Sequence, residues 1–370
     1  MHRTKAVLRG RLLYVVILTL LSLSCYAADA PKNIVFLIGD GMGIGVITAA
    51  RCAGPGQNGQ LAMDSMPVVG LVKTYSANAL VTDSAAAATA YATGVKTNNG
   101  ELSVDPSGKK LRTILEAAHD MGKSTGVVST KFITDATPAA FVSHVTSRAD
   151  RTDIAVQMIS SGADVIMGGG RKDFALKTDT SDGRTDGRDV MAEAAKIGFT
   201  VITTRDEMPD VHSEKVLGLF VQDVMTAFSP EPTLREMTTC AIDCLDNNKK
   251  GFFLMSEGGT IDSFEHASNA GDAVKQTLEF DNTVRMALDY AREHKDTLVV
   301  VTADHDTGGM AVLDPDADHP KYMVGWAHGG HTANMVPIFA FGPGSQYFAG
   351  VHDNTEIPKI FSKLWNCKLN

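Results

Sequence analysis

Six stretches of the chain are almost entirely apolar, are rich in β-branched residues, and end in glycine or an acidic residue. They span residues 33–41, 124–130, 163–170, 251–259, 297–306 and 336–344. A strand with one solvated face alternates apolar and polar residues, whereas continuous apolar runs are typical of strands buried on both faces. These runs therefore predict the interior strands of a largely parallel sheet.

Helical patterns lie between the apolar runs, for example over residues 111–122 and 275–294. Alternating strands and helices predict an α/β fold, a three-layer α/β/α sandwich around a large, mostly parallel central sheet. The polar segment 177–189 is expected to be a surface loop. No repeat or linker interrupts the pattern, so we expect a single domain over residues 28–370.

The N-terminal segment 1–27 has the features of a cleavable export signal. Four basic residues precede the apolar stretch 12–23, and a small-x-small cleavage site ends at Ala27. Twelve apolar residues are too few to span a bilayer comfortably, so a permanent anchor is the weaker interpretation. Cleavage before Cys25 as a lipoprotein is disfavoured by Ser22, which stands where a branched apolar residue is expected. The mature protein is predicted to be periplasmic or secreted.

The charge balance argues against two classes of partner. The whole chain has a net charge of −9, and without residues 1–27 it has 30 basic and 43 acidic residues. An acidic chain with no basic cluster is a poor candidate for binding nucleic acid or an anionic membrane. If the substrate is an anion, bound metal is the obvious local source of attraction.

The cysteines of the mature chain do not suggest a thiolate metal site, because no CxxC motif is present. They are Cys52, Cys240, Cys244 and Cys367. Cys240 and Cys244 stand four residues apart in a helical pattern, a spacing that allows either a disulfide after export or two buried thiols. Both interpretations stay open.

Polar side chains that suit metal binding stand at or after the ends of several apolar runs. They are Asp40, Asp135, Thr137, Glu257, Asp304 and His305. Ligands of open α/β sheets bind beyond the carboxyl ends of the strands, where these side chains would gather. The sequence therefore predicts a polynuclear metal site.

Two further clusters contain histidine. Asp262 and His266 are four residues apart, on one face of a helix, where they could chelate zinc or form an ordinary ion pair. His328 and His331 lie in a glycine-rich loop. Acid plus histidine without thiolate suits zinc, and acid plus hydroxyl without histidine suits magnesium.

Ser84, in the stretch VTDSAAAATA, stands where a helix is expected to begin. By itself this stretch fits a capped helix packed on a sheet as well as a serine positioned for chemistry. The N-terminus of a helix attracts anions through free N–H groups and the helix dipole. Because no histidine is adjacent in sequence, activation of Ser84 would come from a metal ion. Arg148 could bind two phosphate oxygens in bidentate fashion.

Six motifs in order resemble the alkaline phosphatase family, from about residue 33 to the C-terminus. They are GDGMG, VTDSAAAATA, DATPAA…HVTSR, SEGGTID…H, TADHDTGG and GGHTA…VPIFAFGPG. The resemblance implies a bacterial metal-dependent phosphomonoesterase with two zinc ions and one magnesium ion per subunit. It makes Ser84 the phosphorylated nucleophile and Arg148 the clamp on the phosphoryl group.

The resemblance also assigns the metal ligands. Asp262, His266 and His331 would bind the first zinc, Asp40, Asp304 and His305 the second, and Asp40, Thr137 and Glu257 the magnesium. Asp135 stands where some members have aspartate and others histidine, and aspartate suggests magnesium bound through water.

Four features outside the ligand set qualify the resemblance. Asp83 is expected to brace Arg148 or its loop rather than bind metal. Ser263 replaces the lysine, histidine or tryptophan of other members, and His328 matches no ligand position. The segment 306–330 is short where many relatives carry a large interface insertion, so a homodimer with a reduced crown is expected.

The activity implied is hydrolysis of small phosphate monoesters through a phosphoserine, with an alkaline optimum and with inorganic phosphate as product and inhibitor. The nearest alternative is a phosphodiesterase or phosphonate hydrolase of the same superfamily. Arg148 argues against it, since a monoester offers the two charged non-bridging oxygens that such a clamp needs. A phosphomutase is disfavoured by export, and an inactive metal- or phosphate-binding protein by Ser84, which a pure binder does not need.

Overall fold

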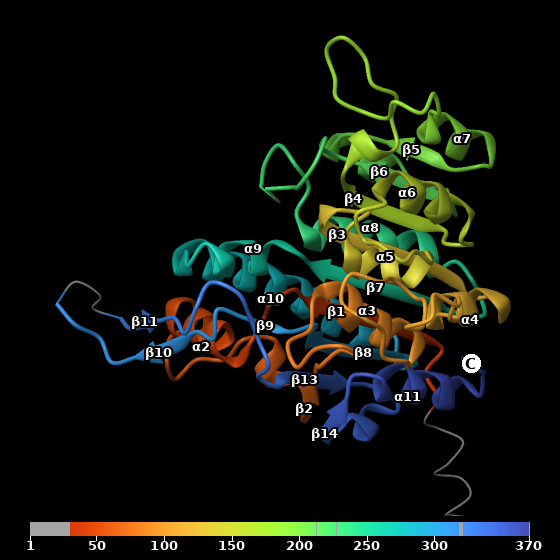
Figure 1. Cartoon of the computed structure of the whole chain (residues 1–370). Helices are drawn as coiled ribbons and strands as arrows, with labels where there is room; N and C mark the ends of the chain where they lie inside the picture. The colour runs from red at the N-terminus through yellow and green to blue at the C-terminus, as the bar shows by residue number, and fades with distance from the viewer. Residues whose placement is uncertain (1–29, 212, 227, 318–320, 370) are drawn as a thin grey trace, which may run out of the picture.

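A ten-stranded sheet forms the middle layer of the protein (Figure 1). In spatial order its strands are β14 (Gly350–Asp353), β2 (Val68–Lys73), β13 (Val336–Phe341), β8 (Thr297–Ala303), β1 (Asn33–Gly39), β7 (Phe252–Gly258), β3 (Ser124–Phe132), β4 (Val165–Gly169), β6 (Val216–Leu219) and β5 (Thr200–Ile202). Strand β13 is antiparallel to both its neighbours, β2 and β8, and the other pairs are parallel. The predicted mostly parallel sheet is confirmed.

The computed structural model describes residues 30–211, 213–226, 228–317 and 321–369. The predicted export signal, residues 1–27, lies outside the described residues. Within these ranges, none of the helices combines the length and the apolar character that crossing a membrane requires.

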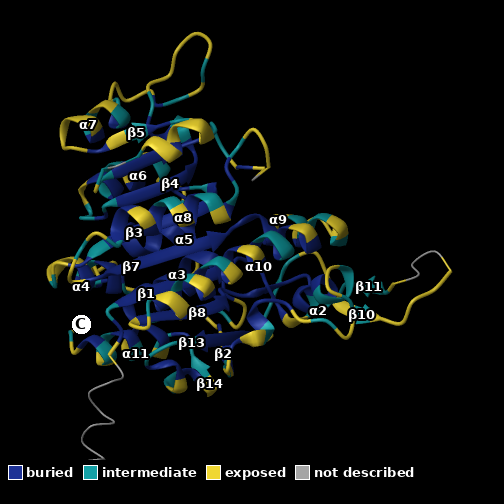
Figure 2. Cartoon of the chain, turned by 180° about the vertical axis from the view of Figure 1, so that it is seen from behind, coloured by how far each residue is buried: buried dark blue, intermediate teal, exposed yellow. Residues whose placement is uncertain are grey.

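Helices cover both faces of the sheet (Figures 1 and 2). One face carries α3 (Ser84–Thr93), α4 (Ile114–Asp120), α5 (Ala136–Val142), α6 (Arg151–Ser160), α7 (Val190–Lys196) and α11 (Glu356–Trp365). The other face carries α2 (Ile44–Ala53), α8 (Leu234–Leu245), α9 (Thr260–His266) and α10 (Ala270–Glu293). Right-handed crossovers between parallel strands put helices on opposite faces when the chain moves in opposite directions along the sheet. The predicted three-layer α/β/α sandwich is confirmed.

The six apolar runs contain β1, β4, β7, β8 and β13 and all but the last two residues of β3, and every residue of β1, β7 and β8 is buried. The sequence patterns missed β2, β5, β6 and β14. These strands lie near the two ends of the sheet, where β5 has three residues, the buried β6 has four, and β2 and β14 are partly exposed. The segment 177–189 is mostly an exposed loop, as expected, although Arg184 is buried and donates to the Asp173 carbonyl at 2.8 Å.

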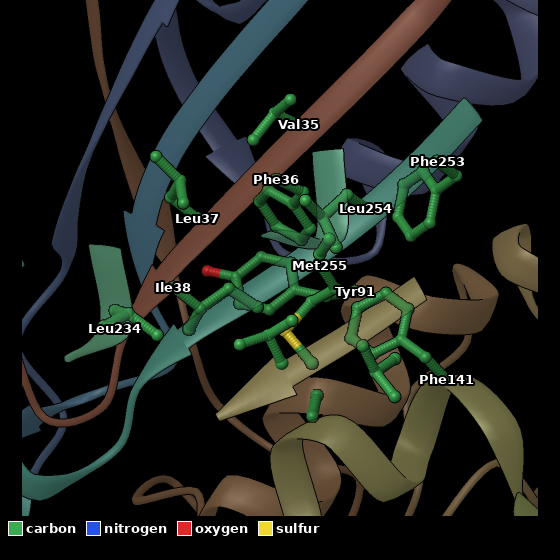
Figure 3. Close-up of a cluster of buried hydrophobic side chains, with 14 of the residues drawn as sticks. Val35, Phe36, Leu37, Ile38, Tyr91, Phe141, Leu234, Phe253, Leu254 and Met255 are labelled. Carbon is green, nitrogen blue, oxygen red and sulfur yellow. The ribbon is translucent and has the colours of Figure 1, made fainter. Parts of the chain in front are cut away.

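Aromatic side chains fix α3 against the sheet. The rings of Phe36 on β1 and Tyr91 on α3 meet edge to face with centroids 5.5 Å apart (Figure 3). The Tyr91 hydroxyl donates to the Ala303 carbonyl, at the end of β8, at 2.7 Å. Every residue of α3 is buried, and its small alanines let the helix approach the sheet closely. These contacts therefore fix the position of the helix that begins at Ser84 relative to the end of β8.

Two small strand pairs lie outside the ten-stranded sheet. They are β9 (Asp306–Thr307) with β12 (His331–Thr332), and β10 (Ala311–Leu313) with β11 (Met323–Gly325). The pair β10–β11 lies beside α2, away from the central sheet (Figure 1). Cys240 and Cys244 are free thiols on α8, so the structure has no disulfide between them.

Candidate active site

The carboxyl ends of β1, β7, β8 and β3 lie side by side, because β1 pairs with β7 and β8, and β7 pairs with β3. In the strand order of the sheet, β2 lies to one side of β1, whereas β3 and β7 lie to the other side, so the chain reverses its direction across the sheet after β2. In open α/β sheets such a switch point leaves a crevice in which ligands bind. All predicted metal-binding positions converge on this crevice.

The helix α3 begins at Ser84, with Asp83 as its N-cap. The Asp83 carboxylate accepts a hydrogen bond from the Ala86 N–H at 3.0 Å, which stabilises the first turn. Ser84 is buried, and its Oγ lies 3.2 Å from His305 Nε2. The fold thus places an imidazole beside this serine although none is adjacent in sequence.

An open cluster is formed by Asp262, His266 and His331, whose possible ligand atoms all lie within 4.8 Å of one another. His266 Nε2 lies 3.2 Å and His331 Nε2 3.5 Å from Asp262 Oδ1. Backbone carbonyls orient both rings, since the Nδ1 atoms lie 2.8 Å from the Gly329 oxygen and 2.9 Å from the Thr82 oxygen, respectively. Such outer contacts turn both Nε2 atoms toward Asp262 and toward each other, 3.1 Å apart, so that the three side chains could share one metal.

A buried cluster follows β1 and β8. His305 Nε2 lies 3.1 Å from Asp304 Oδ2 and 3.6 Å from Asp40 Oδ1, and all three residues are 0% exposed. Ligand atoms of Asp40, Asp262 and His305 also lie within 4.8 Å of one another. Asp40 Oδ1 accepts no hydrogen bond from the described residues. A buried acceptor without a partner is costly, which indicates a site for a cation.

Thr137 and Glu257 form a third group of candidate ligands and are both 0% exposed. Glu257 Oε2 accepts a hydrogen bond from Ser129 at 2.5 Å, but Glu257 Oε1 and Thr137 Oγ1 have no partner among the described residues. Burial, with the nearby Asp135 carboxylate, raises the pKa of Glu257 to about 7. These two buried oxygens, one from a hydroxyl and one from a carboxyl group, are of the kind that a hard cation prefers.

Lys131 lies in the middle of the crevice, and the sequence patterns did not single it out. Its Nζ lies 2.7 Å from Asp40 Oδ2 and 3.5 Å from oxygens of Asp135 and Asp262. Burial lowers the pKa of Lys131, but the carboxylates outweigh it and hold this pKa well above its usual range. The available signal was a lysine directly after the apolar run 124–130, because a charge at the end of a buried strand needs a partner.

Two hydroxyl residues of the site were also missed. Ser129 donates to Glu257, and Thr307 Oγ1 donates to Asp262 Oδ1 at 2.7 Å. Each fixes a carboxylate that sequence reasoning had placed at the site. Nothing in the sequence pattern marks them, since serine and threonine near strand ends are common.

Arg148 bridges two acidic side chains at the mouth of the crevice. Its Nη1 lies 3.2 Å from Asp83 Oδ2 and its Nη2 lies 2.9 Å from Asp135 Oδ1. Asp83 Oδ2 also accepts a hydrogen bond from the Gly100 N–H at 3.0 Å. Asp83 therefore contacts both the arginine and a neighbouring loop, and it makes these contacts from the helix cap.

Two positions lie outside the clusters. Ser263 is exposed on α9. His328 is exposed in the loop before β12, and its Nδ1 accepts from the Gly330 N–H at 3.2 Å.

A serine at a helix N-terminus, facing buried carboxylates and imidazoles at the ends of parallel strands, defines a metal-binding hydrolase of the α/β class. The family model described as alkaline phosphatase matches residues 31–323 and 311–367. The chain belongs to the alkaline phosphatase family, and it is a phosphomonoesterase.

Individual relatives agree with this assignment. Alkaline phosphatase 3 of Bacillus subtilis is 34% identical over 92% of this chain and 91% of its own length. The alkaline phosphatase of the Antarctic bacterium TAB5 has a TM-score of 0.85 at 33% identity, covering 91% of this chain and 99% of its own. A variant of the TAB5 enzyme with aspartate in place of a histidine, with Mg bound in its M3 site, has a TM-score of 0.84 at 33% identity, covering 92% and 99%.

Proposed function

We propose that this enzyme hydrolyses phosphate monoesters through a phosphoserine at Ser84, in a site with two zinc ions and one magnesium ion. The observation that carries the proposal is the position of Ser84. Its Oγ lies at the N-terminus of α3 and 3.2 Å from His305, inside the cluster of candidate ligands. A nucleophile in this position would be next to both the proposed metal ions and the positive end of a helix dipole.

The donor atoms fit these ions. Zinc prefers imidazole nitrogen with carboxylate oxygen, and magnesium prefers oxygen alone. The first zinc would be held by Asp262, His266 and His331, the second by Asp40, Asp304 and His305, and the magnesium by Asp40, Thr137 and Glu257. When bound, the ions would polarise the phosphoryl oxygens and lower the pKa values of the serine hydroxyl and of water.

Asp135 is proposed to hold the magnesium through water. Its oxygens already contact Arg148 at 2.9 Å and Lys131 at 3.5 Å, and water between Asp135 and the ion would leave both contacts in place. The TAB5 variant with aspartate in place of histidine and Mg in its M3 site supports magnesium for an enzyme of this family that has aspartate near the third site.

The chain's own residues account for positioning and attack. Ser84 Oγ would form a bond to phosphorus while the bond to the leaving oxygen breaks, and the leaving alcohol gains the proton that the serine loses. Arg148 has five N–H donors, so its contacts with Asp83 and Asp135 leave others for two non-bridging oxygens. Water would then attack phosphorus, break the Ser84 ester and release inorganic phosphate, which inhibits by occupying the same site.

Localisation and assembly remain predictions. We propose that residues 1–27 direct export to the periplasm or the medium and are cleaved after Ala27, and that the mature enzyme is a homodimer without a nucleic-acid-binding surface. The mass of the secreted protein checks the cleavage site, and light scattering checks the dimer.

The test compares hydrolysis of an aryl phosphate monoester and the matching diester, with and without a chelator. Ser84→Ala is expected to lower the monoesterase rate by at least about 10⁴-fold, the scale of removing a nucleophile that acts with its partners. The matched control is Ser143→Ala, a buried serine that donates to the Ala139 carbonyl of its own helix at 2.7 Å and should keep the activity. Faster cleavage of the diester would refute the monoesterase, and activity after complete chelation would refute the metal mechanism.

A further inference from the structure

Lys131 is the one lysine among the described residues whose ammonium lies within 4 Å of three carboxylates. It is the next-to-last residue of β3, and its side chain is 11% exposed. A Cβ at Gly259 would lie 3.1 Å from Lys131 Cγ, so this glycine leaves the room that the lysine stem uses. The lysine is therefore enclosed in the crevice.

The single ammonium of Lys131 reaches three carboxylates, two of them through hydrogen bonds. An ammonium has three N–H donors, and three carboxylate oxygens lie at 2.7, 3.5 and 3.5 Å from Nζ. These oxygens belong to Asp40, Asp135 and Asp262. In the proposed function, Asp40 binds both the second zinc and the magnesium. Asp135 holds the magnesium through water, and Asp262 binds the first zinc. One ammonium thus links the ligand sets of all three ions.

Lys131 does not satisfy the whole cluster. Within the described part of the chain, Asp40 Oδ1, Thr137 Oγ1 and Glu257 Oε1 have no hydrogen-bond partner, although Asp40 Oδ2 is in contact with the ammonium at 2.7 Å. The ammonium of Lys131 therefore offsets the repulsion among the carboxylates, but it leaves these three oxygens available to a metal ion. A divalent cation at these oxygens would compete with the ammonium for Asp40.

We propose that Lys131 is a tethered cation that stands in for divalent metal in the metal-free enzyme and competes with the ion at the third site. It keeps the carboxylates together before the ions bind. Binding of the ion to Asp40, Thr137 and Glu257 then requires the ammonium to give up its contact with Asp40. This inference rests on the metal site of the proposed function, which it deepens by assigning a residue that sets metal affinity.

The test is calorimetric titration of the metal-free protein with magnesium chloride and with zinc chloride, for wild type and Lys131→Met. The variant keeps the stem and removes the charge. We expect it to bind magnesium at least about tenfold more tightly, and its metal-free form to melt at a lower temperature than wild type. Saturation with metal should close most of this difference in melting temperature.

The matched control is Lys123→Met. Lys123 precedes the same strand and is also buried, but its Nζ donates to the carbonyls of Lys32 and Lys250 at 2.8 and 2.6 Å rather than to acids of the site. It should lower stability with no change in metal affinity. Equal magnesium affinity in wild type and Lys131→Met, or weaker binding in the variant, overturns the inference. A wild type that binds neither metal refutes the metal site of the proposed function instead.

A second measurement covers the case in which metal-free Lys131→Met does not fold. Lys131→Gln is purified with metal bound, and the release of magnesium is followed after a chelator is added. In wild type the ammonium can take the place of the departing ion, so the variant should release magnesium several-fold more slowly. Equal or faster release from the variant contradicts the inference.

Discussion

The active-site crevice has two ends that handle charge differently. At the open end, Asp262 works with two imidazoles, and the His266 side chain is 40% exposed. At the buried end, Asp40 and Glu257 are 0% exposed, and acids outnumber the cations available to them. Water can reach the open end and screen its charges, whereas the buried end needs cations held in the protein. The buried end is where we expect substitutions to matter most.

Among the substitutions that compare the two ends, the largest effect is expected for Asp40→Asn. This change removes a carboxylate that two proposed ions and Lys131 share, so monoesterase activity should fall by at least about 10³-fold. Activity measured over a range of added zinc and magnesium checks it. The control Asp281→Asn removes a buried carboxylate that accepts from the Ala62 and Met63 N–H groups at 2.7 and 3.0 Å, outside the crevice. If both variants lose activity equally, the buried end has no special role.

A smaller effect is expected at the open end for His266→Ala. Asp262 and His331 remain as ligands, so activity should fall by about 10- to 100-fold and should recover in part with excess zinc. Titration of activity with zinc chloride checks the recovery. His144→Ala, which removes a histidine 3.0 Å from Glu116 outside the crevice, should not respond to zinc. A loss in His266→Ala as large as that in Asp40→Asn would erase the difference between the two ends.

The smallest effect is expected in how the stability of the metal-free protein depends on pH. The two ends should lose stability in different pH ranges. Burial raises the pKa of Glu257 to about 7, above its unfolded value of about 4.3, so its contribution to stability is present below that value and is lost as pH rises through 7. The hydrogen bond to Asp262 raises the pKa of His266 to about 9. Its contribution is complete below the unfolded pKa of about 6.5 and is lost as pH rises through 9.

Melting temperatures of the metal-free protein between pH 4 and 10 test these ranges. In Glu257→Gln, the decline between about pH 4 and 7 should be smaller than in wild type. In His266→Gln, the decline between about pH 6.5 and 9 should be smaller. A profile that both substitutions change in the same range would contradict the separation of the two ends.

Much of the fold could be predicted because its central strands are buried on both faces. The runs that contain β1, β7 and β8 have no polar alternation, and a parallel sheet covered by helices is the structure that such runs favour. Strands β5 and β14 are short and lie at the sheet edges, so their burial depends on neighbours that local sequence does not specify. Cys240 and Cys244 were left open for a similar reason, because spacing on a helix permits a disulfide without requiring one.

By itself, the sequence determined the chemistry available to this protein. Motif order identified the family, and the acids and histidines at strand ends marked where a metal site would form. Only the tertiary structure decided which groups meet. It put His305 at 3.2 Å from Ser84, although 221 residues separate them, and it put Lys131 among three carboxylates from three segments of the chain. The physical reason is that residue types and local periodicity are properties of a segment, whereas the partners of a buried charge depend on which strand ends the sheet brings together.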